Sequence, residues 1–259
     1  MVLLLAGLFI QKSAELTTKN KLVAHRGDPT NYPENTVAGI NAAAAAGANW
    51  AEVDIQYTAD FVPVLYHDTD LQRISGDPRK LMQSTWEDIN ELPASYPERF
   101  GGAFDQTRIS TLSDLTAASA NWPDLRLFIE LKRESIEHFG SERIVDDVCE
   151  RISEAVSRDQ IAAIVSKHDV ALQQMRERSA LPIGWVVPDF EAVHESRAKE
   201  MNFEFMFINQ KRFDLWQAGH KKNEQWVVYT VNDQETASHY LAAGADMIET
   251  DEFGKLCSE

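Results

Sequence analysis

The sequence predicts an α/β protein, specifically a TIM-type (β/α)8 barrel. The chain has 259 residues, and barrels of this type need about 250. Short runs rich in β-branched and aromatic residues alternate with helical stretches, which is typical of a parallel sheet covered by helices. The number and length of these β–α units favour a closed barrel over an open doubly wound sheet, an alternative that composition alone does not exclude.

Eight strands are predicted from the apolar runs. They cover Lys21–His25, Trp50–Tyr57, Leu125–Lys132, Ile161–Ser166, Ile183–Val187, Phe203–Asn209, Trp226–Val231 and Met247–Thr250. Helices fill most of the gaps between them, the first with Pro33 in its first turn and the last closed by Gly244. They cover Pro33–Ala46, Thr111–Asn121, Ser141–Ser157, Val170–Arg178, Glu191–Glu200 and Asp233–Ala243.

One further apolar run, Phe61–His67, interrupts the alternation. It follows the second strand too closely for a parallel crossover, so we expect it to fold back as a β-hairpin above the barrel mouth. The next stretch, residues 68–109, is rich in glycine and proline and matches no β–α unit. We expect an insertion over the mouth, either shaping access to a site or forming a surface excursion. One domain, residues 21–259, then accounts for nearly the whole chain.

The N-terminal segment, residues 1–20, contains an apolar run from Val2 to Ile10 that is too short to span a bilayer as a helix. It is either part of a signal-like segment or an extension packed on the domain. The two cysteines, Cys149 and Cys257, lack zinc-like spacing and fit a reducing compartment. We therefore expect a cytoplasmic protein, with export or a periplasmic location as the alternative. The formal charge of −16 argues against nucleic acid or an anionic membrane surface as a partner. Because the apolar run is so short, we also expect no stable membrane insertion.

Charged residues inside two of the predicted strands indicate a cation site. Glu52 and Asp54 lie two apart and share one strand face, as do Glu130 and Lys132 on another strand. Charges on such a face are unfavourable unless they are paired or bind a metal. Carboxylate oxygens without cysteine favour a hard cation, so we expect one divalent ion, Mg²⁺ or Ca²⁺.

Two histidine motifs end strand-like runs of their own. His25 is followed by Arg26 and Gly27, and His67 by Asp68. Barrel enzymes carry their sites at the carboxyl ends of the strands, where all these residues are predicted to lie. Two histidines can divide proton transfer between them, and Arg26 and Lys132 suit a phosphate. Together with a metal, they indicate phosphoester cleavage.

The same residues, in this order, resemble the glycerophosphodiester phosphodiesterase family. The resemblance rests on short motifs spread from Lys21 to Phe253: His25-Arg26-Gly27, Pro33-Glu34-Asn35-Thr36, Glu52-Val53-Asp54, His67-Asp68, Ile129-Glu130-Leu131-Lys132, Tyr229-Thr230-Val231-Asn232, Gly244-Ala245-Asp246 and Thr250-Asp251. It implies a metal-dependent hydrolase on a TIM barrel that converts glycerophosphodiesters to an alcohol and sn-glycerol 3-phosphate.

The resemblance also implies a role for each motif residue. Glu52, Asp54 and Glu130 would be metal ligands, His25 and His67 the acid–base pair, Arg26 and Lys132 the phosphate-binding cations, and Glu34 and Asn35 supporting residues. Trp226 or Tyr229 would line the alcohol side, unless both pack in the core. The small-molecule substrate is the expected partner, and the sequence does not define an oligomeric state.

Other functions remain open at this point. Lysophospholipase D activity would need a wide apolar opening, for which the insertion region offers Phe61, Leu71, Ile74, Leu81, Met82 and Trp86, unless these bury the insertion itself. A phospholipase C-like phosphotransferase would use a similar barrel. A non-catalytic glycerophosphodiester-binding protein would be expected to have lost a histidine or a metal carboxylate, and none is missing from this sequence.

Overall fold

The computed structural model describes residues 19–155, 158–188, 200–213 and 223–257 of the chain. Its centre is a closed barrel of eight parallel strands in the order β1, β9, β8, β7, β6, β5, β4, β2, with β2 pairing back to β1. The strands are β1 (Leu22–Ala24), β2 (Trp50–Tyr57), β4 (Arg126–Leu131), β5 (Ile161–Ser166), β6 (Ile183–Val186), β7 (Phe205–Asn209), β8 (Gln225–Tyr229) and β9 (Met247–Thr250). The predicted (β/α)8 barrel is therefore confirmed.

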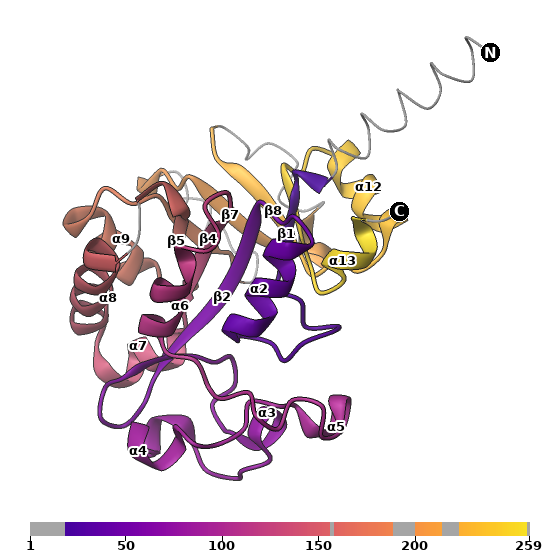
Figure 1. Ribbon diagram of the computed structural model, residues 1–259. Helices are drawn as coiled ribbons and strands as arrows, with labels where there is room; N and C mark the ends of the chain where they lie inside the picture. The colour runs from indigo at the N-terminus through magenta and orange to yellow at the C-terminus, as the bar shows by residue number, and fades with distance from the viewer. Residues whose placement is uncertain (1–18, 156–157, 189–199, 214–222, 258–259) are drawn as a thin grey trace.

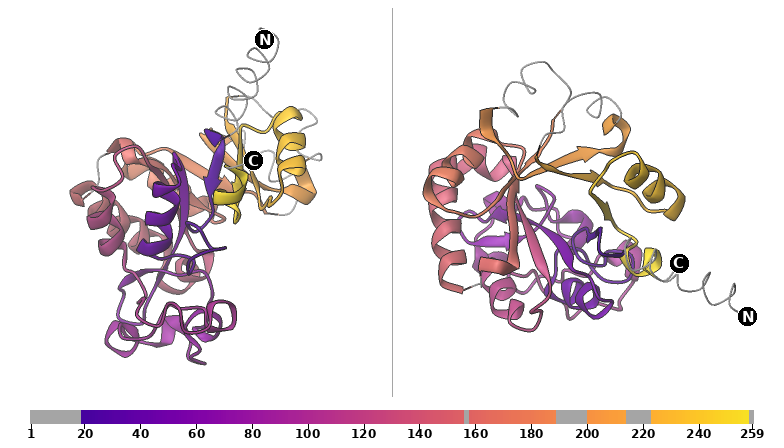
Figure 2. Two further views of the ribbon diagram at one scale, coloured as in Figure 1. Left: turned by 45° about the vertical axis from the view of Figure 1, so that its right-hand side comes forward. Right: turned by 90° about the horizontal axis from the view of Figure 1, so that it is seen from above.

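Helices lie around the outside of this ring, as the view from above in Figure 2 shows. The longer ones are α2 (Val37–Ala45), α6 (Leu112–Ser119), α7 (Arg133–Phe139), α8 (Ser141–Ala155), α9 (Asp169–Arg178) and α12 (Gln234–Ala242), followed by the short α13 (Phe253–Leu256). Short 3-10 turns, η2 (Arg158–Gln160) and η3 (Gln210–Arg212), flank β5 and β7.

The structure differs from the predicted helices in two ways: α2 begins later than expected, and α7 is an additional helix. Pro33 is not in the first turn of α2, because the Thr36 side chain caps the helix by accepting a hydrogen bond from the Gly39 amide, and helical residues begin at Val37. The helix α7 was not predicted, since it directly follows β4 without a loop and lacks a side-chain cap. The predicted helix over Glu191–Glu200 lies almost entirely outside the described residues.

Two apolar layers hold the barrel together. Alternate residues of the strands, such as Val53, Ile55 and Ile129, face outward and pack against the helices. The residues between them face inward, and Phe128, Phe205 and Phe207 fill the barrel interior. The inward positions nearer the carboxyl ends of β2, β4 and β9 carry carboxylates instead, so the polar cluster sits on an aromatic floor.

The predicted hairpin is present. The strand β3 (Pro63–Leu65) runs antiparallel to the carboxyl-terminal half of β2, from Ile55 to Tyr57, beyond the point where β2 pairs with β1. This return brings His67 to the barrel mouth. The Gln56 side chain fixes the returning chain by donating to the carbonyl oxygens of His67 and Asp68, each at 2.7 Å.

The insertion lies at the carboxyl-terminal end of the barrel, below the strands in Figure 1. It contains α3 (Gln72–Ser75), the 3-10 turn η1 (Leu81–Gln83), α4 (Trp86–Ile89) and α5 (Pro97–Phe100). It contacts the loop between β1 and α2 through the rings of Tyr32 and Phe104. None of residues 68–109, all of which the structure describes, lines the cavity at the mouth, although the insertion lies at the same end of the barrel.

The apolar residues of the insertion pack on one another. Leu71, Ile74 and Leu81 are buried in a small core of their own, against which Trp86 packs. Phe61 stacks on Tyr57. Phe61 therefore packs against the barrel, whereas Leu71, Ile74, Leu81 and Trp86 pack within the insertion.

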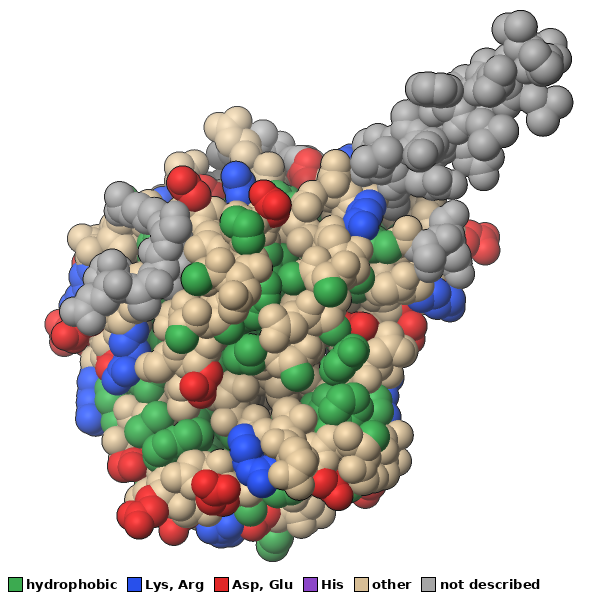
Figure 3. Space-filling view, in the orientation of Figure 1, with side chains coloured by type: hydrophobic (Ala, Val, Ile, Leu, Met, Phe, Trp, Pro, Cys, Tyr) green, Lys and Arg blue, Asp and Glu red, His purple; other side chains and the backbone are tan. Residues whose placement is uncertain are grey.

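Figure 3 shows acidic and basic side chains interspersed over the described part of one face of the molecule. This mixture fits a solvated surface more than a single charged binding patch. Within the described ranges, no helix has both the length and the apolar character needed to cross a bilayer.

Candidate active site

A cavity of about 200 Å³ opens at the carboxyl ends of the strands. Six of the seven side chains predicted to carry the chemistry line it: His25, Arg26, Glu52, His67, Glu130 and Lys132. The seventh, Asp54, is 1% exposed and lies beneath them. The other described lining residues are Val165, Lys167, Val186, Phe207, Asn209, Tyr229, Thr230 and Glu249.

His25 directly follows β1, and its ring is held from both sides. Its Nδ1 donates to Oδ1 of Asp251 at 2.7 Å, which leaves Nε2 directed toward Glu52 and Glu249. Burial opposes the charged ring, but the Glu249 charge and the Asp251 hydrogen bond outweigh it and raise the pKa of His25. This histidine is therefore poised to hold or release a proton at Nε2.

The turn after His25 brings the backbone to the carboxylates. Arg26 and Gly27 both have positive φ, at 54° and 93°. This conformation directs the Arg26 amide to Oε2 of Glu52, at 3.3 Å. A Cβ on Gly27 would lie 2.7 Å from the Gly39 carbonyl carbon of α2, so only glycine permits this close approach.

Glu52, Asp54 and Glu130 come together as the strand alternation predicts. One carboxylate oxygen from each lies within 4.8 Å of the others. Burial and the charges of Asp54 and Glu249 raise the pKa of Glu52 well above its usual value. The Oε1 atom of Glu52 is buried and accepts no hydrogen bond. A buried carboxylate oxygen without a partner is unfavourable, and a cation would satisfy it.

Asp54 is the most heavily paired of these carboxylates. Its oxygens accept from Lys132 Nζ at 3.2 Å and from Asn35 Nδ2 at 2.8 Å, and Nε of Arg26 lies 3.1 Å away. Although burial opposes its charge, Lys132 and Arg26 hold the pKa of Asp54 far below its usual value. Asn35, at a positive φ of 53°, also accepts from the Asp54 amide, so it holds this residue in place from two directions.

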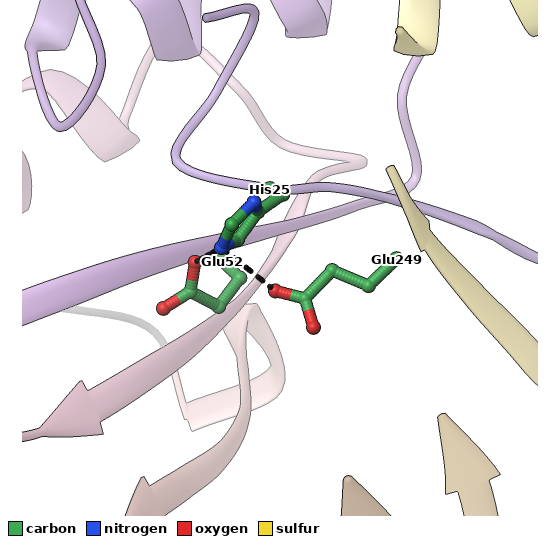
Figure 4. Close-up of side chains that lie close together, drawn as sticks. All are labelled: His25, Glu52 and Glu249. Atoms are coloured by element: carbon green, nitrogen blue, oxygen red, sulfur yellow. Dashed lines mark ion pairs between the residues drawn. The ribbon is translucent and has the colours of Figure 1, made fainter. Parts of the chain in front are cut away.

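Glu249 was not among the predicted site residues. It projects from β9, is 4% exposed, and its Oε1 lies 3.6 Å from Nε2 of His25. Figure 4 shows His25, which follows β1, converging with Glu52 and Glu249 from the neighbouring strands β2 and β9. Burial raises the pKa of Glu249 to about 7, the charge of His25 opposes this shift, and that of Glu130 adds to it. With His25 and Glu52 it forms a second group whose ligand atoms lie within 4.8 Å of one another.

His67 is held in the same way as His25. Its Nδ1 donates to Oδ1 of Asp68 at 2.8 Å. Arg73, from α3 of the insertion, binds the same carboxylate and also Glu34. Although burial opposes its charge, the hydrogen bonds from His67 and Arg73 hold the pKa of Asp68 below its usual range. Glu34 in turn accepts from Arg26 at 2.9 Å, so the first loop and the hairpin share one ionic network.

The donor set fits a hard divalent cation. Glu52, Asp54 and Glu130 offer oxygen ligands alone, and Oε1 of Glu52 is a buried oxygen without a partner. The second group also contains Glu52 but includes the His25 ring nitrogen. Oxygen donors without sulfur favour Mg²⁺ or Ca²⁺.

Glu249 and Asp251 were not predicted as site residues, although their spacing in the sequence could have indicated them. Glu249 lies in the last strand and Asp251 directly follows it, so the two acids have the same two-residue spacing as Glu52 and Asp54. Of the two aromatic residues considered for the alcohol side, Tyr229 lines the cavity. Trp226 is buried in the core.

A larger cavity, about 570 Å³, lies at the opposite end of the barrel, beside the amino-terminal ends of the strands. Its described lining includes Trp50, Arg126 and Phe205 but no histidine. Of its charged residues, Glu204 is paired with Arg176. The smaller cavity at the carboxyl ends is therefore the better candidate for chemistry.

Ionisable side chains gathered at the carboxyl ends of a parallel barrel are the arrangement that (β/α)8-barrel enzymes use. The chain belongs to the glycerophosphoryl diester phosphodiesterase family, whose model matches residues 25–255. It is 27% identical over 244 residues to the glycerophosphodiester phosphodiesterase of Caldanaerobacter subterraneus, a match that covers 90% of this chain and 95% of that protein.

Other relatives match over a shorter region or in fold alone. Human glycerophosphodiester phosphodiesterase 1 is 36% identical over 110 residues, which is 42% of this chain, and the match spans 33% of the length of that protein. An Oleispira antarctica phosphodiesterase, solved in complex with the product sn-glycerol-3-phosphate, superposes with a TM-score of 0.81. Its sequence identity is 22%, over 94% of this chain and 98% of that chain.

Proposed function

We propose that the protein hydrolyses glycerophosphodiesters to an alcohol and sn-glycerol 3-phosphate, with one divalent cation and a histidine acid–base pair. The observation that carries this proposal is the convergence of His25, His67 and the carboxylate cluster on one cavity. Family membership and the product named for the Oleispira protein support the substrate class.

In this proposal Glu52, Asp54 and Glu130 hold the cation. When bound, a divalent ion would neutralise phosphoryl oxygens and draw electrons from phosphorus. Arg26 and Lys132, which are paired with Glu34 and Asp54, would contribute positive charge beside the same oxygens. Glu34 and Asn35 act as supports, since each is hydrogen-bonded to a residue with a direct role.

The two histidines divide the proton transfers. Each has a carboxylate at Nδ1, which fixes the tautomer that leaves Nε2 available. One Nε2 takes the proton of the nucleophile, either water or the free hydroxyl beside the phosphoester, as the new P–O bond forms. The other gives its proton to the alcohol oxygen as the old P–O bond breaks. Attack by the hydroxyl would produce a cyclic phosphate that water then opens.

The cavity favours a small substrate over a lysophospholipid. Its volume is about 200 Å³, and three of the apolar residues that could have lined a wide opening, Leu71, Ile74 and Leu81, are buried in the core of the insertion. A cytoplasmic location is part of the proposal and fits the free state of Cys149 and Cys257. The product named for the Oleispira protein supports a small-molecule partner.

The test is turnover of a panel of glycerophosphodiesters with added Mg²⁺ or Ca²⁺, coupled to detection of glycerol 3-phosphate. We expect turnover of glycerophosphocholine or a related diester, little turnover of lysophosphatidylcholine, and loss of activity on chelation. Glu52→Gln should lose activity, while Glu137→Gln, on the exposed face of α7, should not. Activity that persists in excess chelator would refute the metal requirement, and release of glycerol plus a phosphorylated alcohol would refute the proposed cleavage.

A further inference from the structure

Arg73 has an unusual set of partners for an insertion residue. Its guanidinium binds two carboxylates at once, each through two hydrogen bonds. It contacts Asp68 at 2.7 and 3.1 Å and Glu34 at 2.6 and 2.8 Å. Arginine is suited to such forked pairing, because its planar group offers several N–H donors in fixed directions.

Both carboxylates lead directly to residues that line the cavity. Asp68 accepts from Nδ1 of His67 at 2.8 Å, and Glu34 accepts from Arg26 at 2.9 Å. Arg73 is therefore connected to a proposed acid–base histidine through one carboxylate, and to a proposed phosphate-binding arginine through another. Arg73 itself does not line the cavity.

The placement of Arg73 is also well defined. Its guanidinium lies 5.2 Å from the centre of the Tyr96 ring, a cation–π contact within the insertion. The backbone of His67 and Asp68 is held separately by Gln56 of β2. Loss of Arg73 would therefore leave the chain path of the hairpin intact and free the two carboxylate side chains.

From these contacts we infer that Arg73 is a positioning residue for the proposed hydrolysis. It holds Asp68 so that the His67 ring presents Nε2 to the cavity, and it holds Glu34 so that Arg26 faces the phosphate. The insertion thus belongs to the reactive apparatus without touching the substrate. This inference rests on the proposed function, and it assigns a task to the insertion that the sequence left undecided.

The alternative is that Arg73 only fastens the insertion to the barrel. In that case its removal would lower stability, and activity would fall in proportion to the unfolded fraction. A positioning role predicts a lower kcat in protein that is fully folded, because a small displacement of a reacting group can cost up to ~100-fold in rate.

The experiment compares Arg73→Gln and Arg73→Lys with the matched control Arg79→Gln. Arg79 is also in the insertion and also makes a forked pair, with Asp77, but on the exposed surface. We expect Arg73→Gln to lower kcat by about 10-fold or more at a temperature where unfolding curves show it to be folded. Arg73→Lys should recover part of this loss, since an ammonium keeps the charge without the fork, and Arg79→Gln should match the parent protein.

Two further measurements separate positioning from fastening. In a double-mutant cycle, Asp68→Asn added to Arg73→Gln should cost little more than Arg73→Gln alone, because both act through His67. In proton NMR, the hydrogen-bonded Nδ1–H resonance of His67, assigned by its loss in His67→Ala, should broaden or shift in Arg73→Gln. If Arg73→Gln does not fold, Arg73→Lys carries the same comparison.

The inference is overturned if folded Arg73→Gln keeps kcat within about twofold of the parent, if the two substitutions act additively, or if the His67 resonance is unchanged. If the parent protein cleaves no glycerophosphodiester, the proposed function fails. The NMR comparison then still decides whether Arg73 orients His67.

Discussion

His25 and His67 present the same local design from different parts of the chain. Each donates Nδ1–H to a carboxylate, Asp251 in one case and Asp68 in the other. Their surroundings differ, because His25 also faces Glu249 and Glu52, whereas the Asp68 carboxylate beside His67 is shared with Arg73. Two histidines in unlike electrostatic settings suit a reaction that needs one proton acceptor and one proton donor.

Replacing either histidine with alanine tests these roles. We expect His25→Ala and His67→Ala to reduce turnover by at least ~100-fold, the usual scale for loss of an acid or base. Folding and divalent-ion binding should stay near those of the parent protein. His239→Ala, at an exposed position on α12, is the control. Near-parental turnover in either site variant would exclude that histidine from proton transfer.

Glu249→Gln tests the electrostatic setting of His25. Burial opposes the charged ring, and Glu249 is the largest contributor that raises the pKa of His25. Removing this negative charge should lower the pKa of His25, so the limb of the pH–rate profile that reports this residue should move to lower pH. Glu235→Gln, an equal change of charge at an exposed position, should leave the profile in place. A shift to higher pH, or none, would contradict the assignment.

Among the elements, the turn between β1 and α2 matters most to the site. It holds Arg26, Glu34 and Asn35, and two of its residues need a left-handed backbone to direct their polar groups at Glu52 and Asp54. Gly27, near the start of this turn, packs directly on the backbone of α2. The geometry of this turn and the position of the helix therefore depend on each other.

Gly27→Ala should destabilise the protein for this reason. The backbone strain alone is worth about 1–3 kcal/mol, and the contact of 2.7 Å with the Gly39 carbonyl carbon adds to it. The free energy of unfolding from urea titration is the measurement. Gly254→Ala, within α13 where a Cβ meets no atom within 4 Å, should be neutral or slightly stabilising. Equal effects of the two substitutions would contradict the argument.

At this scale the sequence predicted much of the structure, for identifiable reasons. The inward carboxylates of β2 and β4 could be predicted because successive side chains of a strand point to opposite faces, so residues two apart share a face. The start of α2 was wrong because a side-chain cap, Thr36, outweighed the preference of Pro33 for a first turn. Arg73 could not be predicted, since its role depends on a hairpin and a loop that meet only in three dimensions.

For the whole molecule, the buried carboxylates link stability, pH and metal. Burial and neighbouring charges raise the pKa of Glu249 from about 4.5 to about 7 and that of Glu52 well above its usual value. The folded metal-free protein therefore keeps protons on these groups that the unfolded chain has already released. Its free energy of unfolding should fall as the pH rises through this range.

A bound divalent cation should reverse this penalty by compensating the charges. We expect Mg²⁺ or Ca²⁺ to raise the melting temperature more at about pH 8 than at about pH 5, and binding near neutral pH to release protons. Thermal unfolding at the two pH values and calorimetry in buffers of different ionisation enthalpy measure these effects. In Glu52→Gln the ion-dependent increase should be much smaller. An increase that is larger in acid would contradict the linkage.

The ring of strands closes at a narrow seam. The strand β1 has three residues, and only two register pairs join it to β2, compared with six between β2 and β4. His25 follows this short strand directly, and the groups that face it come from the strands on either side. A ligand that bridges His25, Glu52 and Glu249 would link β1 to both of its neighbouring strands. Binding of such a ligand would therefore stabilise the closed barrel, and a stably closed barrel would favour binding.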